Sequence, residues 1–296
     1  MKILAVTQKV DQNDPVLGFF HRWLEEFAKH FEKITVICLE KGAYNLPSNV
    51  KVLSLGKEDG VSKLEYLGRF YKYIWQERNN YEAVFVHMNQ EYILAAGDFW
   101  RLWGKRVYLW RNHREGSWLT RLAVLFSHKV FYTSPQSYTA QFSKAVKMPV
   151  GVDTDFFKPN PLVVRIPDSI LFLGRIAPVK RVLEFVQWFN VQDEKFHATV
   201  AGAALPKDME YEKLVKAKAS KRIKFIGPVT QDEALKLYQS HETYVNKTPA
   251  GSFDKTILEA AACGMKLKVD NPEAENLVVE EHSLEKLMNK LVQELR

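Results

Sequence analysis

The sequence has few of the residues that cross-link or interrupt a fold. Its 296 residues include two cysteines, Cys38 and Cys263, which are too few for a disulfide framework or a four-cysteine zinc site. With 14 glycines and 12 prolines, the chain is neither fibrous nor of low complexity. No apolar run approaches the ~20 residues of a membrane span, and the run at residues 3–7 is shorter than the ~7–15 residues of a signal-peptide core. These absences favour a folded protein of a reducing, cytoplasmic compartment.

What is present is an ordinary globular composition with an uneven distribution of charge. Hydrophobic residues make up 46% of the chain and charged residues 26%. Residues 1–150 contain 21 Lys and Arg against 14 Asp and Glu, whereas residues 151–296 contain 21 of each, so the formal charge of +7 belongs to the first half. Six of the seven tryptophans also lie there. This asymmetry favours an anionic partner for the first half.

Short β-branched runs alternate with amphipathic stretches along the whole chain. Strands are predicted at residues 2–7, 34–39, 50–55, 83–87, 107–110, 129–133, 169–173, 196–201, 223–226 and 243–246. Helices are predicted at residues 19–31, 61–79, 179–190, 207–219, 231–240, 255–263 and 283–295. Such alternation is typical of βαβ units with mainly parallel sheets.

A turn-rich segment at residues 149–161 predicts a domain boundary. We expect two Rossmann-like, doubly wound α/β domains, 1–150 and 151–296, facing each other across a cleft. Ligands then bind at the carboxyl ends of the strands. The last helix is free in this scheme to pack back on the first domain.

Two segments of the second half carry candidate chemistry. In the first, a buried strand ends at Gly174-Arg175, and Lys180 follows near the start of a helix. Two cations beside a helix N-terminus suit a diphosphate, although a pair of plain surface cations is the alternative. In the second, residues 249–264, a Gly/Ser loop precedes a helix that holds Glu259 among alanines. That carboxylate needs a partner, such as a ribose diol or Lys255 one turn earlier.

With the hinge phrase Gly-Val-Asp-Thr-Asp-Phe-Phe-Lys-Pro at 151–159, these segments resemble the family-4 type of retaining glycosyltransferase (glycosyltransferase group 1), which has the two-domain GT-B fold. The family's Gly-Arg and following Lys are matched by Gly174, Arg175 and Lys180. Its Glu-Gly-Phe-Gly-x-x-x-x-Glu-Ala-x-Ala-x-Gly phrase is matched at a subset of positions, namely Phe253, Glu259, Ala260, Ala262 and Gly264.

The resemblance implies a retaining, metal-independent transfer of a sugar from a UDP- or GDP-sugar to a hydroxyl acceptor, with no cofactor. Arg175 and Lys180 would bind the diphosphate and neutralise the charge that develops as the glycosidic bond breaks. Glu259 would hold the ribose and Thr256 a phosphate. The implied donor-binding set is completed by Gly18, Gly174, Gly251, Ser252, Phe253 and Lys255.

One departure from the family pattern concerns the donor sugar. The first Glu of the phrase is replaced by Gly251, and Asp254 stands where the family has Gly. Asp254 either replaces the lost contact to a sugar hydroxyl, which makes it a catalytic candidate, or caps the following helix. The missing Glu also leaves open a non-catalytic nucleotide-sugar-binding module.

The first half offers weaker signals. Gly18 is the candidate for a turn near the donor phosphates, and a plain turn is the alternative. His113, which follows a strand, resembles the family's acceptor-side histidine better than His87 does, and a structural histidine is the alternative for both. Residues 99–114 interleave aromatic side chains with Arg and Lys. Core packing is the default there, and an anionic membrane face on the cytoplasmic side for a lipid or lipid-linked acceptor is the alternative.

Other classes fit less well. A nicotinamide dehydrogenase is excluded because no Gly-x-Gly-x-x-Gly follows the first strand. The helix phrase argues against a nucleotide-sugar epimerase of the same fold. Nucleic acid is not expected as a partner, because no recognised nucleic-acid motif accompanies the basic residues.

Overall fold

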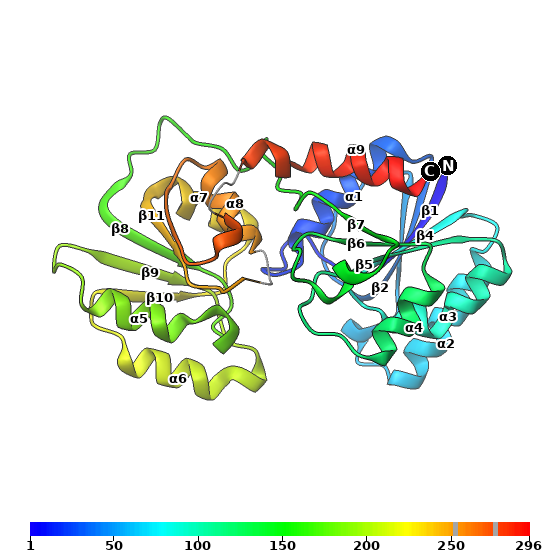
Figure 1. Ribbon diagram of the computed structural model, residues 1–296, viewed down its shortest axis with the longest axis horizontal. Helices are drawn as coiled ribbons and strands as arrows, with labels where there is room; N and C mark the ends of the chain where they lie inside the picture. Colours follow the sequence, from blue (N-terminus) through cyan, green and yellow to red (C-terminus); the bar gives the residue numbers. More distant parts are fainter. Residues whose placement is uncertain (251–253, 275–277) are drawn as a thin grey trace. The chain divides into compact units, whose positions relative to one another are not determined.

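The computed structural model describes residues 1–250, 254–274 and 278–296, which divide into two compact units (Figure 1). The first unit comprises Met1–Pro149 with Glu285–Arg296, and the second comprises Val150–Leu284. One unit is built on a seven-stranded sheet and the other on a five-stranded sheet. The predicted class, two doubly wound parallel α/β sheets, is confirmed.

The first sheet has the strand order β3-β2-β1-β4-β5-β6-β7, and all its neighbours are parallel. Its strands are β1 (Lys2–Val10), β2 (Lys33–Lys41), β3 (Val50–Ser54), β4 (Ala83–His87), β5 (Arg106–Trp110), β6 (Lys129–Tyr132) and β7 (Ala145–Lys147). Its helices are α1 (Gly18–His30), α2 (Lys63–Gln76), α3 (Glu91–Leu102), α4 (Trp118–Phe126) and α9 (Leu284–Leu295).

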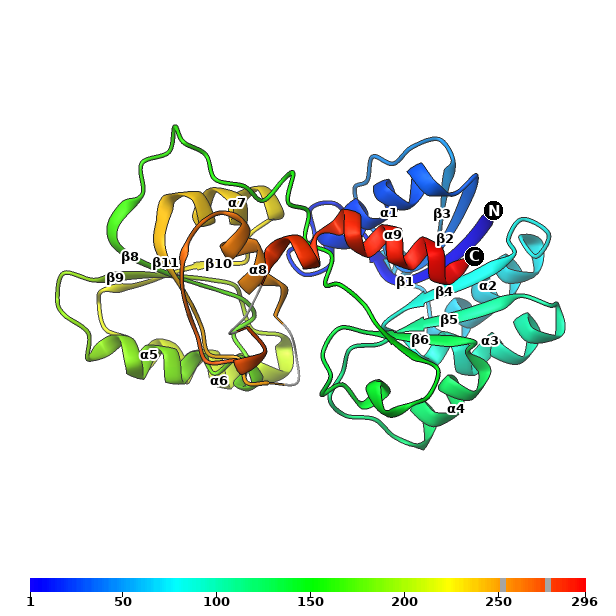
Figure 2. The ribbon, with the colours of Figure 1, turned by 45° about the horizontal axis from the view of Figure 1, so that its top comes forward.

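The chain first adds strands on one side of β1, as β2 and β3, and then on the other side, from β4 to β7. The helices are distributed over the two faces accordingly. From β1 the chain moves outward through α1 to β2, and it then crosses back through α2, α3 and α4. Because such crossovers are right-handed, α1 lies on one face and α2, α3 and α4 lie on the other, as Figures 1 and 2 show. Both faces are thus covered, so central strands such as β4, which is apolar up to its last residue, are fully buried.

The second sheet has the order β10-β9-β8-β11-β12, again parallel. Its strands are β8 (Ile166–Leu173), β9 (His197–Ala201), β10 (Ile223–Gly227), β11 (His241–Asn246) and β12 (Lys266–Val269). Its helices are α5 (Val182–Asn190), α6 (Met209–Lys218), α7 (Gln231–Ser240) and α8 (Lys255–Ala262). Figure 1 shows α5 and α6 on one face and α7 and α8 on the other.

Short 3-10 turns join these elements: η1 (Lys57–Asp59), η2 (Tyr138–Gln141), η3 (Pro178–Lys180), η4 (Pro206–Asp208), η5 (Pro272–Ala274) and η6 (Val279–His282). Lys180 therefore lies in η3, ahead of α5, rather than in the helix itself. Two predicted helix boundaries are confirmed. Thr230 caps α7 in a reciprocal pair with Glu233, and Gly264 follows α8 with a φ of +72°.

The aromatic and basic stretch at residues 99–114 is not one surface feature. It consists of the end of α3, a turn at Gly104 with a φ of +69°, all of β5, and the first residues of the loop after β5. Trp100 and Trp110 are buried in the core, with exposed fractions of 0% and 4%. The Arg106 guanidinium binds the carbonyl oxygen of Arg296 at the end of α9. Core packing, the default expectation for this stretch, thus holds for Trp100 and Trp110, whereas Phe99 and Leu102 are exposed.

Candidate functional site

Polar side chains gather at the carboxyl ends of β8 and β11 in the second unit. The two strands are neighbours in the sheet. The residues come from the turn after β8, from the loop after β11 and from the first turns of α8. This grouping joins the two segments that the sequence singled out, although about 70 residues separate them along the chain.

Glycine lets β8 and β9 end in close contact. Gly174 and Gly202 have φ values of +157° and +136°, and a Cβ on Gly202 would lie 1.9 Å from the Gly174 carbonyl oxygen. Beyond this crossing the chain turns at Arg175, whose side chain is exposed. Within the described ranges, no hydrogen bond or ion pair engages the Arg175 guanidinium. Its charge is therefore available to a ligand at the end of the sheet.

Lys180 is held by an internal carboxylate. Its ammonium lies 2.7 Å from Asp254 Oδ2, and the two side chains are 14% and 11% exposed. Asp254 Oδ2 also accepts hydrogen bonds from Asn246 Nδ2 (3.0 Å) and Thr248 Oγ1 (3.1 Å). Asp254 occupies the N-cap position of α8, but its carboxylate makes no capping hydrogen bond. The structure thus gives this side chain a partner that neither sequence-based alternative named.

The Asp254 carboxylate is ionised in this setting. Burial alone would raise its pKa, but the charge of Lys180 and the hydrogen bonds from Lys180, Asn246 and Thr248 outweigh burial and lower the pKa below its usual value. The stabilisation from this group is therefore present above the usual carboxyl pKa and lost as the pH falls through the lowered one. At neutral pH the ion pair is intact.

Thr256 lies at the same sheet end. The Tyr244 hydroxyl is 2.6 Å from Thr256 Oγ1 and 3.3 Å from the Leu173 carbonyl oxygen, and it accepts from Asn246 Nδ2 at 3.2 Å. Burial raises the pKa of Tyr244, which keeps its proton. Asn246 and Tyr244 thereby tie the Lys180–Asp254 pair to Thr256.

Glu259 is buried one turn further along α8, with 4% of its surface exposed. Its Oε2 accepts a hydrogen bond of 3.0 Å from the hydroxyl of Tyr238 on α7. Burial and the charge of Glu259 raise the pKa of Tyr238, so this hydroxyl stays protonated and donates. An ionised carboxylate has two oxygens and can accept several hydrogen bonds, as a diol would require.

The candidates of the first unit lie on three separate elements. Gly18 opens α1, and its amide donates to the Asp14 carbonyl (3.0 Å). His113 is exposed in the loop after β5, and its Nδ1 accepts from the Glu115 amide at 3.1 Å. His87 is 3% exposed and stacks on Phe20 with a centroid distance of 4.4 Å, as expected of a structural histidine.

Three predicted residues, Gly251, Ser252 and Phe253, lie outside the described residues. Lys255 is half-buried at the start of α8. Four residues of this cluster were not predicted: Asn246 and Thr248, which fix Asp254, and the tyrosines at 238 and 244. One signal for the first two was present in the sequence: polar residues directly after a buried strand of a parallel sheet mark a ligand edge.

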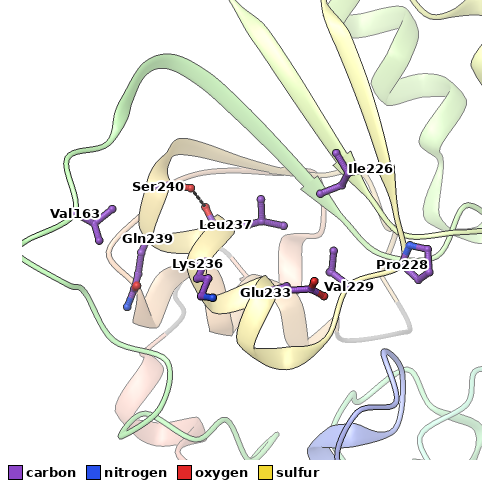
Figure 3. A pocket seen from close by; sticks show the side chains of 9 residues that line it. All are labelled: Val163, Ile226, Pro228, Val229, Glu233, Lys236, Leu237, Gln239 and Ser240. Atoms are coloured by element: carbon purple, nitrogen blue, oxygen red, sulfur yellow. Dashed lines mark hydrogen bonds between the residues drawn. The ribbon is translucent and has the colours of Figure 1, made fainter.

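A pocket of about 530 Å³ lies beside α7 (Figure 3). Its lining comes from one side of α7, from the end of β10 and the residues after it, and from Val163. None of the lining residues belongs to the cluster at β8 and β11. Across residues 1–250, 254–274 and 278–296, no group of three or more His, Cys, Asp or Glu side chains is arranged to hold a metal ion.

The sequence and the fold were compared with known proteins. A family model described as glycosyl transferases group 1 matches residues 167–294. None of the proteins with curated descriptions gives a significant match. Three similar solved structures are HepE of Anabaena with UDP-glucose, sucrose-phosphate synthase of Thermosynechococcus elongatus, and the apo form of the lipopolysaccharide outer core galactosyltransferase WaaB.

The likeness to these structures spans the chain at low identity. HepE is 16% identical with a TM-score of 0.70, and the alignment covers 99% of this chain and 89% of HepE. The synthase is 14% identical with a TM-score of 0.73, and the alignment covers 100% of this chain and 90% of the synthase. WaaB is 14% identical with a TM-score of 0.60, and the alignment covers 100% of this chain and 89% of WaaB. Residues 167–294 thus match the model of the glycosyltransferase group 1 family, and the chain as a whole is similar in fold to GT-B structures.

Proposed function

We propose that the protein transfers a sugar from a nucleoside diphosphate sugar, with UDP as the nucleotide, to a hydroxyl acceptor with retention of configuration. The observation that carries the proposal is the Arg175 guanidinium, unpartnered among the described residues, at the carboxyl end of β8. It lies on the same sheet edge as Lys180, Thr256 and Glu259. HepE and its complex with UDP-glucose supply the choice of nucleotide.

In the proposed reaction, the bond between the anomeric carbon and the diphosphate oxygen breaks, and its electron pair stays on that oxygen. Arg175 and Lys180 offset the charge that develops there, which lowers the barrier most if both are already in place. The acceptor oxygen bonds to the anomeric carbon on the same face, and its proton passes to the leaving phosphate. Glu259 holds the ribose, and His113 hydrogen-bonds on the acceptor side.

Binding of UDP is expected to raise the melting temperature, because a ligand that binds only the folded state stabilises it by about 2.7 kcal/mol at 100 times its Kd. The measurement is a thermal-shift series with UDP, GDP, UDP-glucose and GDP-mannose. A rise with the uridine compounds alone supports the proposal. If no nucleoside diphosphate shifts the transition, both transfer and nucleotide-sugar binding are ruled out.

The residue at position 251 favours a second candidate, a nucleotide-sugar-binding module without transfer activity, because Gly cannot supply the carboxylate that the family has there. Slow release of UDP from UDP-glucose separates the two. We expect the wild type to release UDP and an Arg175→Ala variant not to. Binding without release from any sugar nucleotide would favour the module.

The first unit has an exposed apolar surface. We define the α2–α3 face as Tyr71, Trp75, Phe99, Leu102 and Trp103. Trp75 and Leu102 are 56% and 82% exposed. The rings form a continuous series, with centroid distances of 6.0 Å for Tyr71–Phe99, 6.1 Å for Phe99–Trp103 and 5.8 Å for Trp75–Trp103.

Cations border the α2–α3 face. The Arg78 guanidinium lies 4.1 Å from the Trp75 ring centroid, and Lys72 and Arg101 are exposed beside the face. Asp98 is the exposed carboxylate on the same part of α3. Aromatic side chains with Arg and Lys suit the interface of an anionic bilayer, and no helix among the described residues is long and apolar enough to cross one. We therefore propose a membrane-associated enzyme acting on a lipid or lipid-linked acceptor.

Vesicle sedimentation tests the α2–α3 face. The wild type is expected to bind vesicles of phosphatidylcholine with phosphatidylglycerol, more weakly at high salt, and a Trp75→Ser/Leu102→Ser variant to lose most of that binding. The matched control is Leu162→Ser, which removes an 89% exposed leucine from the second unit. Equal binding by all three proteins would contradict the assignment, as would self-association through this face without lipid binding.

A further inference from the structure

The carboxylate of Asp254 is fixed by the scaffold independently of Lys180. Asn246 and Thr248, which donate to it, are 2% and 1% exposed. Asn246 is itself held, because its Nδ2 also donates to Tyr244 and its Oδ1 accepts from the Thr248 amide at 2.9 Å. Asp254 therefore has a defined position whether or not a cation is bound to it.

Lys180, by contrast, depends on Asp254. Lysine carries its charge on a flexible four-carbon stem. In this chain that stem starts from a 3-10 turn, directly before Arg181 with its φ of +51°. Within residues 1–250, 254–274 and 278–296, the hydrogen bond to Asp254 Oδ2 is the polar contact that holds the Lys180 ammonium. An ammonium has three N–H donors, so two remain for a ligand.

We propose that Asp254 is a positioning residue, which holds Lys180 in the orientation that receives the donor diphosphate and remains bound to it when the donor enters. The inference rests on the proposed function. It gives Asp254 a role in place of a direct contact to a sugar hydroxyl. Preorganisation also explains why an anion is tolerated beside a diphosphate site: it neutralises part of the site's charge, but it removes the cost of ordering Lys180 during binding.

The direction in which Asp254→Asn changes the affinity for UDP-glucose distinguishes this role from simple repulsion of the donor. If Asp254 only repelled the donor, Asp254→Asn would bind UDP-glucose more tightly. If it positions Lys180, Asp254→Asn weakens binding by roughly three- to tenfold, the value of ordering one long side chain. Thr248→Val removes one donor to the carboxylate and is expected to give a smaller loss in the same direction.

A double-mutant cycle with Lys180→Ala, read as the Kd for UDP-glucose, tests whether Asp254 acts through Lys180. We expect Asp254→Asn to have no further effect in the Lys180→Ala background. Glu210→Gln is the matched control, since it breaks the Lys213–Glu210 ion pair, also 2.7 Å long, on the surface of α6. Additive losses, or tighter binding by Asp254→Asn, would overturn the proposal.

A second measurement does not need the donor. The rate at which acetic anhydride modifies Lys180, followed by peptide mass spectrometry, is expected to rise at least threefold in Asp254→Asn and to stay unchanged in Glu210→Gln. An unchanged rate in Asp254→Asn overturns the positioning role even if the donor binds. Failure of the wild type to bind any nucleotide sugar overturns the proposed function instead.

Discussion

Replacing Arg175 with alanine is expected to lower kcat/KM for the nucleotide sugar by about 100- to 1000-fold, the usual effect of removing one group that faces developing charge. Arg175 is exposed at the carboxyl end of β8, and no described residue pairs with its charge. Lys180, in contrast, already shares its charge with Asp254. We therefore expect the uncompensated cation to carry the larger part of the interaction with the diphosphate.

The measurement is the rate of UDP release over a range of UDP-glucose concentrations. Arg175→Lys keeps the charge but not the planar, two-pronged donor, so we expect it to recover only part of the activity. Lys221→Ala is the matched control, because it removes an exposed cation just before β10, at the amino end of a strand in the same sheet. Similar losses in Lys221→Ala and Arg175→Ala would show that general charge, not the position of Arg175, attracts the donor.

The positions of the buried strands along the chain could be predicted from the sequence, because a parallel sheet covered on both faces produces continuous apolar runs. β4 is an example, as all its five residues are buried. The short strands β7 and β12 were not predicted. β12 reads Lys-Leu-Lys-Val and is mostly exposed, so it lacks the apolar run that marks a central strand. Such strands are defined by their pairing with a neighbour, which a local pattern does not contain.

The sequence names candidate residues one by one, but it does not show which of their side chains contact one another. Arg175 and Lys180 follow the carboxyl end of β8, Thr256 lies in the first turn of α8 after β11, and Glu259 lies one turn further along α8. The ion pair between Lys180 and Asp254 joins residues 74 positions apart and depends on β8 and β11 being neighbours. Only the strand order reveals that contact.

Surface composition was the least predictable property. Trp100 and Trp103 lie three residues apart at the end of α3, yet Trp100 is fully buried and Trp103 is half-buried. Which face of a helix is covered depends on its neighbours in the tertiary structure. The α2–α3 face combines residues from two helices, and the stretch at residues 99–114 contains residues of only one of them, α3.

The second large effect is expected from Gly202→Ala, which should lower the free energy of unfolding by at least ~3 kcal/mol, because a strained φ and a backbone clash both contribute. A Cβ there would lie 1.9 Å from the carbonyl oxygen of Gly174 and 2.8 Å from its carbonyl carbon. No flexible side chain can move aside to relieve this contact, so the ends of β8 and β9 must separate.

Gly227→Ala is the control that isolates the clash. Gly227 also has a positive φ, +80°, at the end of the adjacent strand β10, but no atom of the described residues lies within 4 Å of the point that a Cβ would occupy. We expect Gly227→Ala to lower the free energy of unfolding by only the ~1–2 kcal/mol that a left-handed backbone costs a non-glycine residue.

Urea unfolding followed by circular dichroism compares the two variants. Because Arg175 follows Gly174 directly, Gly202→Ala should also weaken UDP binding under conditions where the protein is still folded, whereas Gly227→Ala should not. Equal stability of the two variants would mean that the β8–β9 crossing is loose enough to admit a side chain, and Arg175 would then lack the fixed position from which it meets the diphosphate.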